Sequence, residues 1–390
     1  MTSPSTLRAS QQILGFCDQP HEDWLSQIDG RYRPVWETLP AEHQTALARY
    51  FLPHRSSKAV VGPTRPRVIK WYCPFAGQGV FPSGHRYCLN TYTGCAHRCR
   101  YCYAAAGYEP DEAAPKRDFV SLLEKDLADL ERFDVPPAPI HLSNSTDPLQ
   151  QNLEDRFGRT KLALEGMLAH RRRFTTVTIL TKNPGLAASA EYAQLLAALG
   201  APGADHPTAA KWRADGAPAV QVEVSLAFWR EEASRFWDPG APSVAERIAG
   251  IRALREAGIS VILRIDPLFP RSPLPTPAGR NLSDFALAEA QTADDLDNLV
   301  SLAKATGVRH VVFSPVKIVQ PRRSRMTPEM SRLLHVYRAI ASPEKAVWRG
   351  GSWRLPPSAA ERFITGPFLE VCRRQRVLAK FCMRNLVETP

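Results

Sequence analysis

The chain has 390 residues, of which 44% are hydrophobic and 23% charged, ordinary proportions for a globular protein with a large core. Its polar start carries no apolar leader, and no apolar run is long enough to cross a bilayer, so we expect a cytoplasmic protein with no membrane partner. Eight cysteines in a chain of this length exclude a disulfide-rich scaffold.

The net charge of +11 is concentrated near the C-terminus. Residues 317–390 hold 15 Lys and Arg against 5 Asp and Glu, so +10 of the charge lies there. One interpretation is a phosphate-bearing partner, either nucleic acid or a nucleotide. The other is a solvated basic face that aids solubility.

Residues 1–85 show no alternation of strands and helices, and we expect an N-terminal extension there. From residue 86 onward, short β-branched or apolar runs alternate with amphipathic runs, the pattern of parallel βα units. The expected strands are 87–92, 140–143, 175–181, 220–227, 261–267 and 310–314. The expected helices are 119–133, 160–170, 187–199, 244–257, 293–306 and 328–340.

Six such units are fewer than the eight of a closed barrel. The sequence therefore predicts an α/β fold, a partial (β/α)6 TIM-like barrel, with residues 86–316 as its core. Residues 317–390 are expected to add the last helix of the core and a basic C-terminal segment.

Three cysteines directly follow the first expected strand. Cys95, Cys99 and Cys102 have the spacing C-x3-C-x2-C, which fits a tight loop around one inorganic centre. A [4Fe–4S] cube normally takes four thiolates, so three leave one iron open, and an open position is typical of a catalytic metal site. The alternatives are a zinc site of the three cysteines plus His97, and buried apolar thiols.

Polar residues stand at the C-terminal ends of the next expected strands, where a buried parallel strand is normally apolar. Ligands of open α/β sheets bind beyond these ends, so the pattern predicts a lined cavity. The alternative is that single residues cap helices or are solvated. The residues are Thr146, Lys182, Ser225 and Asp266.

The cysteine motif resembles the signature of the radical S-adenosylmethionine (SAM) superfamily. The resemblance implies a [4Fe–4S] cluster on Cys95, Cys99 and Cys102 that passes one electron to SAM and releases a 5′-deoxyadenosyl radical. It also implies a flavodoxin- or ferredoxin-type electron donor. A partial barrel is the usual core of that superfamily.

The chemistry of SAM then suggests roles for the polar residues. Its carboxylate needs a cation, a role suited to Lys182. Ser225 and Asp266 could bind the ribose hydroxyls, and Tyr101 or Tyr103 could form an aromatic wall for the adenine.

A closer resemblance, over residues 86–315, is to the spore photoproduct lyase-like branch. It implies that SAM contacts Tyr101, Tyr103, Thr146, Lys182 and Ser225. The motifs that carry it are Tyr92-Thr93-Gly94 before Cys95, Thr146-Asp147-Pro148, Thr181-Lys182, Val224-Ser225, the run 238–243 and Arg247.

Two positions depart from that branch. Asn144 stands where the DNA-repairing lyases carry a hydrogen-donor cysteine, and Asp266 stands where they have a small residue. The resemblance therefore specifies how a radical is made and not which substrate it attacks.

Four of the remaining cysteines could ligate an auxiliary iron–sulfur cluster that anchors substrate, relays an electron or donates sulfur. Cys73 and Cys88 bracket a glycine-containing loop that could bring both thiolates together. Cys372 and Cys382 are ten residues apart, so a helix between them must break for both to ligate. The alternative is that all four are buried structural thiols.

The sequence predicts a radical SAM enzyme that abstracts hydrogen from a phosphate-bearing substrate, a nucleotide or nucleoside, followed by lyase chemistry or sulfur insertion. A second interpretation is a DNA repair enzyme like the photoproduct lyases, with the basic C-terminal segment and Arg171–Arg173 as a phosphate-binding surface. A third is a non-catalytic iron–sulfur or zinc protein that binds nucleic acid. The polar strand ends argue against the third.

Overall fold

The computed structural model describes most of the chain from residue 87 onward. The described residues are 41, 44, 67–70, 87–104, 112–135, 137–143, 145–201, 218–274, 279–319, 326–342, 344–349, 351–382 and 386–387. Cys73 and Asn144 lie outside them, as do Cys17 and most of the N-terminal extension.

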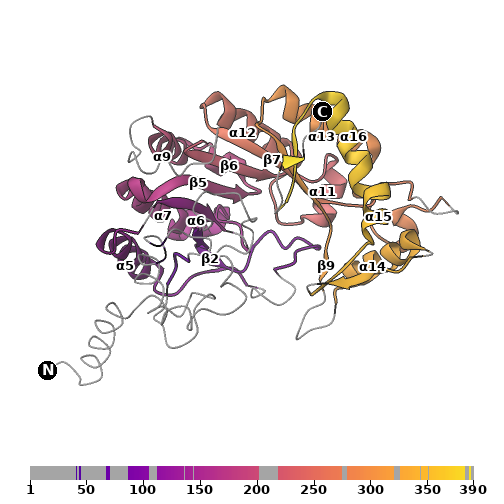
Figure 1. Cartoon of the computed structure of the whole chain (residues 1–390), viewed down its shortest axis with the longest axis horizontal. Coiled ribbons are helices and arrows are strands. Elements are labelled where there is room, and N and C mark those ends of the chain that lie inside the picture. Colours follow the sequence, from indigo (N-terminus) through magenta and orange to yellow (C-terminus); the bar gives the residue numbers. More distant parts are fainter. Residues whose placement is uncertain are drawn as a thin grey trace, which may run out of the picture.

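One large sheet organises the molecule (Figure 1). Its spatial order is β1-β4-β5-β6-β7-β8-β12-β13, and every neighbouring pair is parallel except β12 with β13. The strands are β1 (Tyr87–Leu89), β4 (Ala138–Leu142), β5 (Phe174–Thr181), β6 (Val220–Ser225), β7 (Ser260–Leu268), β8 (Val311–Pro315), β12 (Ala379–Phe381) and β13 (Leu386–Val387).

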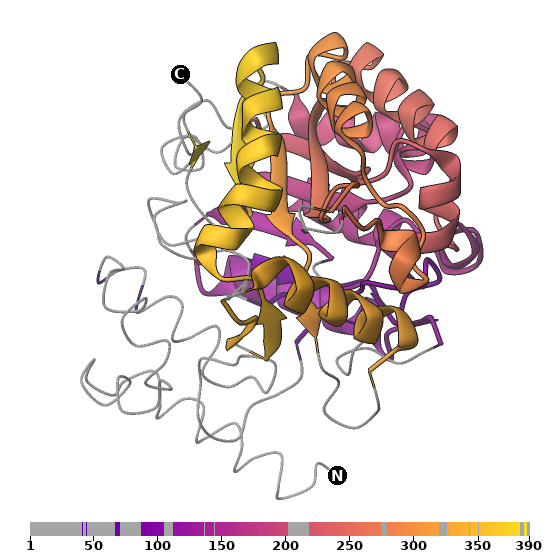
Figure 2. The same cartoon turned by 90° about the vertical axis from the view of Figure 1, so that its right-hand side faces the viewer.

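Helices connect the strands and form an arc outside them (Figure 2). Side chains close the first turns of the longer helices: Ser243 and Glu246 form a reciprocal capping box on α12, and Thr292 and Asp295 form another on α13. The helices are α5 (Phe119–Arg132), α6 (Gln151–Phe157), α7 (Arg159–Ala169), α8 (Pro184–Ala187), α9 (Ala190–Gly200), α11 (Glu231–Trp237), α12 (Val244–Glu256), α13 (Ala293–Ala305), α14 (Pro328–Ala341), α15 (Pro357–Ala360) and α16 (Gly366–Gln375).

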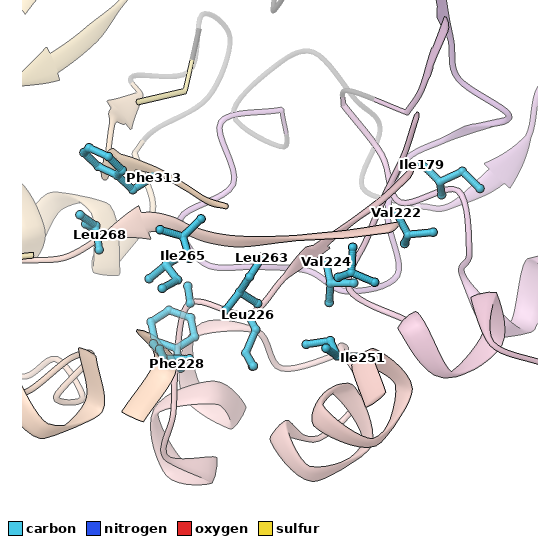
Figure 3. Packing of buried hydrophobic residues seen from close by; sticks show 14 of the residues in the cluster. Ile179, Val222, Val224, Leu226, Phe228, Ile251, Leu263, Ile265, Leu268 and Phe313 are labelled. Atoms are coloured by element: carbon cyan, nitrogen blue, oxygen red, sulfur yellow. The ribbon is translucent and has the colours of Figure 1, made fainter. Parts of the chain in front are cut away.

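The two faces of the sheet have different chemistry. Side chains alternate along a strand, so neighbouring residues point to opposite faces. Val224 and Leu263 lie on the helix side, where Ile251 of α12 packs toward them (Figure 3). The opposite face, called here the inner face, carries Glu223 and Ser225 of β6 and Arg264 and Asp266 of β7.

The predicted α/β fold with an open parallel barrel is confirmed. All six expected strands and all six expected helices are present, with ends shifted by a few residues. The first expected strand is divided into β1 and the short β2 (Tyr92–Thr93). The sheet also has a seventh parallel strand, β12, which pairs with β8 and comes from the segment expected to be merely basic.

The small part of the N-terminal extension that the structure describes packs on the core. Lys70 forms a β-bridge with Cys88 of β1, and Arg67 donates to buried Asp126 of α5 (2.9 Å). The sequence of this extension also shows helical patterns near 24–28 and 41–51, and these residues fall almost entirely outside the described ones. The boundaries proposed at residues 85 and 316 remain predictions.

Two small sheets complete the fold. β2, which directly precedes the three cysteines, pairs with β3 (Ala114–Pro115), which follows them. β9 (Ile318–Val319), β10 (Val347–Arg349) and β11 (Ser352–Arg354) form an antiparallel sheet near α14. None of the helices described is both long and apolar enough to cross a membrane.

Candidate functional site

The loop that carries the three cysteines is docked on the turn between α11 and α12. Arg100 N donates to Trp237 O (2.9 Å), and Gly240 N donates to His97 O (3.0 Å). The His97 ring nitrogen Nδ1 lies 2.9 Å from Gly240 O. A Cβ atom at Gly240 would lie 2.2 Å from a backbone oxygen of the loop, so only glycine allows this approach.

Asp147 ties the same loop to the carboxyl ends of β4 and β5. Its carboxylate accepts hydrogen bonds from Thr181 Oγ1 (2.7 Å) and Lys182 N (2.6 Å), and His97 Nε2 lies 3.0 Å from its Oδ2. Burial opposes the charge on this carboxylate, but His97 and the hydrogen bonds outweigh it and lower the pKa of Asp147. The Asp-Pro motif therefore positions the cysteine loop.

The three cysteines lie together at the carboxyl edge of the sheet, each partly exposed. Burial and the charge of Asp147 raise the pKa of Cys95 to about 12, and burial and Asp238 raise the pKa of Cys99 well above its usual value. Each is raised further by its neighbouring cysteines. Thiols in this state give up their protons when a metal centre binds.

The geometry does not fit the zinc alternative. In the described part of the chain, no three or more His, Cys, Asp or Glu side chains converge on a point that could hold one metal ion. His97 is engaged by Gly240 and Asp147 instead of turning toward the cysteines. A [4Fe–4S] cube distributes its thiolates over separate irons, so this result does not count against a cube.

Lys182 lies beside the cysteines and contacts two other predicted site residues, Tyr101 and Ser225, as well as Asp238. Its Nζ donates to Tyr101 Oη (2.8 Å), Ser225 Oγ (3.1 Å) and Asp238 Oδ2 (3.1 Å). Burial opposes the ammonium charge, but Asp238 and the Cys99 thiol outweigh burial and raise the pKa of Lys182. The site therefore holds a permanent cation next to the cysteine loop.

Asp238 was not predicted as a site residue. The signal was present, because residues 238–243 formed one of the motifs behind the resemblance, but the motif gave no role. In the structure, Asp238 accepts hydrogen bonds from Tyr101 (2.6 Å), Lys182 (3.1 Å) and Arg247 (3.1 Å).

Two hydroxyl groups at the end of β4 lack an internal partner. Thr146 Oγ1 and Ser143 Oγ are buried, and neither has a hydrogen-bond partner among the residues described. Ser143 also has a φ of 60°, a left-handed backbone conformation that is costly for a residue with a side chain. Buried polar groups normally have partners, so these two fit a site that a ligand completes. Thr146 was predicted as a site residue, whereas Ser143 belongs to the polar run 143–148 that was expected to line the cavity and was given no role of its own.

Asp266 belongs to a different part of the inner face. Its carboxylate oxygens accept from Arg264 Nη2 (2.6 Å) and Ser314 Oγ (2.6 Å). Arg264 also donates to Glu223 (2.6 Å). Tyr103, whose pKa is raised by burial and by Cys102, lies close enough to Arg264 and Asp266 for their charges to act on it. Tyr103 thus stands between the cysteine loop and this group.

The described cysteines of the predicted auxiliary cluster are not brought together. Cys382 follows β12 on the inner face, where Sγ lies 3.0 Å from Arg264 Nη2. Cys372 is fully buried on α16, in the core on the helix side, and burial raises its pKa to about 12. Cys88 is buried in β1 beside His141 of β4. Because Cys372 and Cys382 lie on opposite sides of the sheet, a cluster bound to both does not fit.

The arginine run is not the phosphate-binding surface considered for DNA. Arg171–Arg173 form a short 3₁₀ helix directly before β5, at the amino edge of the sheet, opposite the cysteine loop. Arg171 donates to the carbonyls of Leu199 and Phe174, Arg172 to Glu131, and Arg173 to Glu131 and Asp134. Their donors serve the protein's own acceptors.

No family model matches the chain. The uncharacterized proteins Rv2578c of Mycobacterium tuberculosis and Mb2609c of Mycobacterium bovis are each 29% identical to it over 283 residues, which is 71% of this chain and 71% of theirs.

Among solved structures, a mutant of spore photoproduct lyase matches with a TM-score of 0.50 at 12% identity, over 76% of both chains. A second lyase mutant, with bound AdoMet and dinucleoside spore photoproduct, has a TM-score of 0.48 at 14% identity, also over 76% of both chains. TsrM, a radical SAM methyltransferase from Kitasatospora setae, has a TM-score of 0.37 at 17% identity, over 58% of this chain and 35% of its own. The open parallel sheet with its helices outside is thus the fold of the radical SAM enzyme spore photoproduct lyase.

Proposed function

We propose that this protein is a radical SAM enzyme. Cys95, Cys99 and Cys102 hold a [4Fe–4S] cluster, which, when bound, supplies the electron that cleaves SAM to a 5′-deoxyadenosyl radical. The observation that carries the proposal is the charged Lys182 ammonium beside three partly exposed cysteines, brought together from different strand ends at the carboxyl edge of the sheet.

The side chains of the chain have separate roles in holding SAM. Lys182 donates to the carboxylate of SAM, since its largely buried ammonium lies beside the cysteine loop. The hydroxyls of Thr146 and Ser225 donate to or accept from the polar groups of SAM, and the Ser143 hydroxyl adds a third. SAM would supply the partners that Thr146 and Ser143 lack among the described residues, and this stabilises the complex.

Tyr103 is the better candidate for the adenine wall. The Tyr101 ring already packs against Phe228 (5.9 Å between centroids) and Phe269 (5.7 Å), and its hydroxyl is held by Asp238. Tyr103 directly follows Cys102, and the charges of Arg264 and Asp266 on the inner face act on it. Asp266 is proposed to act with Arg264 on that face rather than with Lys182, because both of its oxygens are already engaged there.

The substrate is proposed to be a phosphate-bearing nucleotide or nucleoside. Support comes from the +10 charge of residues 317–390. The inner face near Arg264 carries two carboxylates, Glu223 and Asp266, against one guanidinium. It therefore suits a neutral, hydrogen-bonding part of the substrate, and the phosphate binds outside it.

The runner-up functions receive less support. DNA repair by the lyase mechanism needs a hydrogen-donor cysteine, and this chain has Asn144 at that position. The arginine run 171–173, considered as a phosphate-binding surface for DNA, lies at the opposite edge of the sheet from the cysteine loop. Sulfur insertion would need an auxiliary cluster, and Cys372 and Cys382 lie too far apart, on opposite sides of the sheet, to ligate one together. A non-catalytic binding protein has no use for a buried cation and unpartnered hydroxyls beside the cysteines.

Anaerobic reconstitution with iron and sulfide tests the proposal. We expect about four irons and four sulfides per chain, and production of 5′-deoxyadenosine from SAM with dithionite or with a flavodoxin or ferredoxin as electron donor. Cys99→Ala should abolish cleavage and reduce bound iron. Cys372→Ala is the matched control, because it removes a thiol from the core on the helix side. This variant should keep its bound iron and its SAM cleavage. Zinc without sulfide, or full cleavage by Cys99→Ala, would refute the proposal.

A further inference from the structure

Asp238 is a buried carboxylate shared by groups from three distant parts of the chain. It follows α11 and is 1% exposed. Its Oδ1 accepts from Tyr101 of the cysteine loop (2.6 Å), and its Oδ2 accepts from Lys182 after β5 and Arg247 of α12 (both 3.1 Å). Each donor occupies a different structural element, so the carboxylate is the point where they meet.

Asp238 is the carboxylate that offsets the positive charge of Lys182. Two buried cations, Lys182 and Arg247, face this one carboxylate. Burial opposes its charge, but the two cations outweigh burial and hold the pKa of Asp238 far below its usual range. Removing one member of such a buried group leaves uncompensated charge in a low-dielectric site, which is far costlier than losing a surface ion pair.

The residues on either side of Asp238 also hold the cysteine loop. Trp237 O accepts from Arg100 N (2.9 Å), and Gly240 exchanges two contacts with His97. Cys99 itself is close enough to Asp238 for the charge of the carboxylate to act on it. The same turn therefore positions both the proposed cluster ligands and the proposed SAM-binding cation.

In the structure the three N–H donors of Lys182 engage Tyr101, Ser225 and Asp238, so the carboxylate of SAM takes the place of one of the two neutral hydroxyls. Tyr101 and Ser225 are neutral hydroxyls, so Asp238 is the partner that balances the ammonium charge. Its other oxygen holds Tyr101, which is itself one residue before Cys102. The orientation of Lys182 is thereby fixed relative to the cysteine loop.

We propose that Asp238 is a positioning residue that couples the cluster-binding loop to the SAM-binding lysine. This inference rests on the proposed function. Asp238 orients Lys182 toward the cysteines and places one negative charge beside Cys99. Residues that orient metal ligands in this way typically change metal affinity or activity 10–100-fold when they are replaced.

The direction of the electrostatic effect distinguishes this role from a merely structural one. Asp238→Asn removes a negative charge near the cluster, so reduction becomes easier and the midpoint potential should become more positive. Lys182→Met removes a positive charge from the same place, so the potential should become more negative. A variant that only loosened the loop would shift both potentials in the same direction.

The experiment is a redox titration of the reconstituted cluster without SAM, followed by a SAM-binding titration. We expect opposite shifts of potential for Asp238→Asn and Lys182→Met, and SAM binding weakened about tenfold in Asp238→Asn. Asp126→Asn is the matched control: Asp126 is equally buried and paired with Arg67, but it lies on α5 away from the cysteines. It should leave the potential and SAM affinity unchanged.

Asp238→Asn with the wild-type potential and SAM affinity would overturn the inference while leaving the proposed function intact. If the wild-type chain takes up no cluster, the proposed function itself fails. Should Asp238→Asn not fold, Tyr101→Phe removes one arm of the same contact and keeps the ion pair. It should weaken SAM binding by a smaller factor, and wild-type SAM affinity in that variant would refute the coupling.

Discussion

Two groups of paired charges lie at opposite edges of the sheet, and they serve different purposes. The first, the Lys182 group, lies at the carboxyl edge and consists of Lys182, Asp238, Arg247, Tyr101 and Ser225. The second, the Glu131 group, lies at the amino edge and consists of Glu131, Asp134, His170, Arg172 and Arg173.

The Glu131 group is balanced by its own partners. Glu131 receives hydrogen bonds from Arg172 and Arg173, and Arg173 also reaches Asp134 and the carbonyl of Val135. The Lys182 group carries one more cation than anion and lies beside thiols and buried hydroxyls that lack partners among the described residues. A balanced group stabilises the fold, whereas an unbalanced, incompletely satisfied group is what a ligand site requires.

Substitution of Gly240 is expected to have the largest effect on the carboxyl edge. In Gly240→Ala the new Cβ would meet the cysteine loop at 2.2 Å from a backbone oxygen, so the loop must move. We expect more than half of the bound iron and nearly all SAM cleavage to be lost. Gly200→Ala in α9 is the control, since its Cβ would meet Val220 only at 4.0 Å. Full iron content in Gly240→Ala would show that the docked turn is not needed.

Lys182→Met separates ligand binding from stability. The methionine fills similar space without charge, so SAM should bind about 10–100-fold more weakly because a charge-assisted hydrogen bond is lost. Isothermal titration with SAM measures this. Lys161→Met, which breaks an exposed contact with Glu191, should bind SAM as the wild type does. If Lys182→Met bound SAM as tightly as the wild type, the extra positive charge at the carboxyl edge would not be a SAM-binding group.

Glu131→Gln tests the balanced group at the amino edge. Burial opposes the charge, but Arg172, Arg173 and His170 outweigh it and lower the pKa of Glu131 from 4.5 to about 2. A carboxyl with a lowered pKa stabilises the fold above pH 4.5 and loses this contribution as the pH falls toward about 2.

We therefore expect Glu131→Gln to lower the free energy of unfolding at pH 7 by about 1–2 kcal/mol, less than the pKa shift alone corresponds to because solvent screens these partly exposed pairs, with the difference from wild type shrinking between pH 4.5 and 2. Urea unfolding followed by circular dichroism measures it. Glu191→Gln, a surface substitution, should show no such difference, and SAM cleavage should be unchanged in both. A constant difference at all pH values would mean that the charge of Glu131 is not what stabilises this edge.

The smallest expected effect comes from Thr146→Val. The substitution removes a buried hydroxyl that has no partner among the described residues, so the free energy of unfolding should stay the same or rise by up to about 1 kcal/mol. SAM affinity should fall about fivefold, because the hydroxyl loses its ligand partner. Opposite changes in stability and affinity would mark Thr146 as a ligand-binding residue. A loss of stability with unchanged affinity would instead mark it as structural.

The elements of the core were predictable because their patterns are local. β5 is a run of β-branched and apolar residues, β6 alternates valine with polar residues, and α12 and α13 begin with capping boxes that can be seen in the sequence. The cysteine loop and Lys182 could be found from their positions after strands. The general rule that ligands bind at carboxyl strand ends placed them together.

The parts that were missed depend on contacts between distant residues. β12 has only three residues and becomes a strand through its register with β8, which no local pattern specifies. Asp238 contacts Lys182, which is 56 residues away in the sequence, and Tyr101, which is 137 residues away. Cys372 and Cys382 were grouped because they are close in sequence, but α16 and β12 place them on opposite sides of the sheet.

The late position of β12 has a consequence for synthesis of the protein. The cysteine loop leaves the ribosome after about a quarter of the chain, but β12, at residues 379–381, is made near its end. Until then the edge of β8 has no parallel neighbour on that side, and an unpaired edge invites association with other chains. Chains that stop before residue 379 should therefore aggregate, and the sheet that supports the site should form only after residues 379–381 have been released.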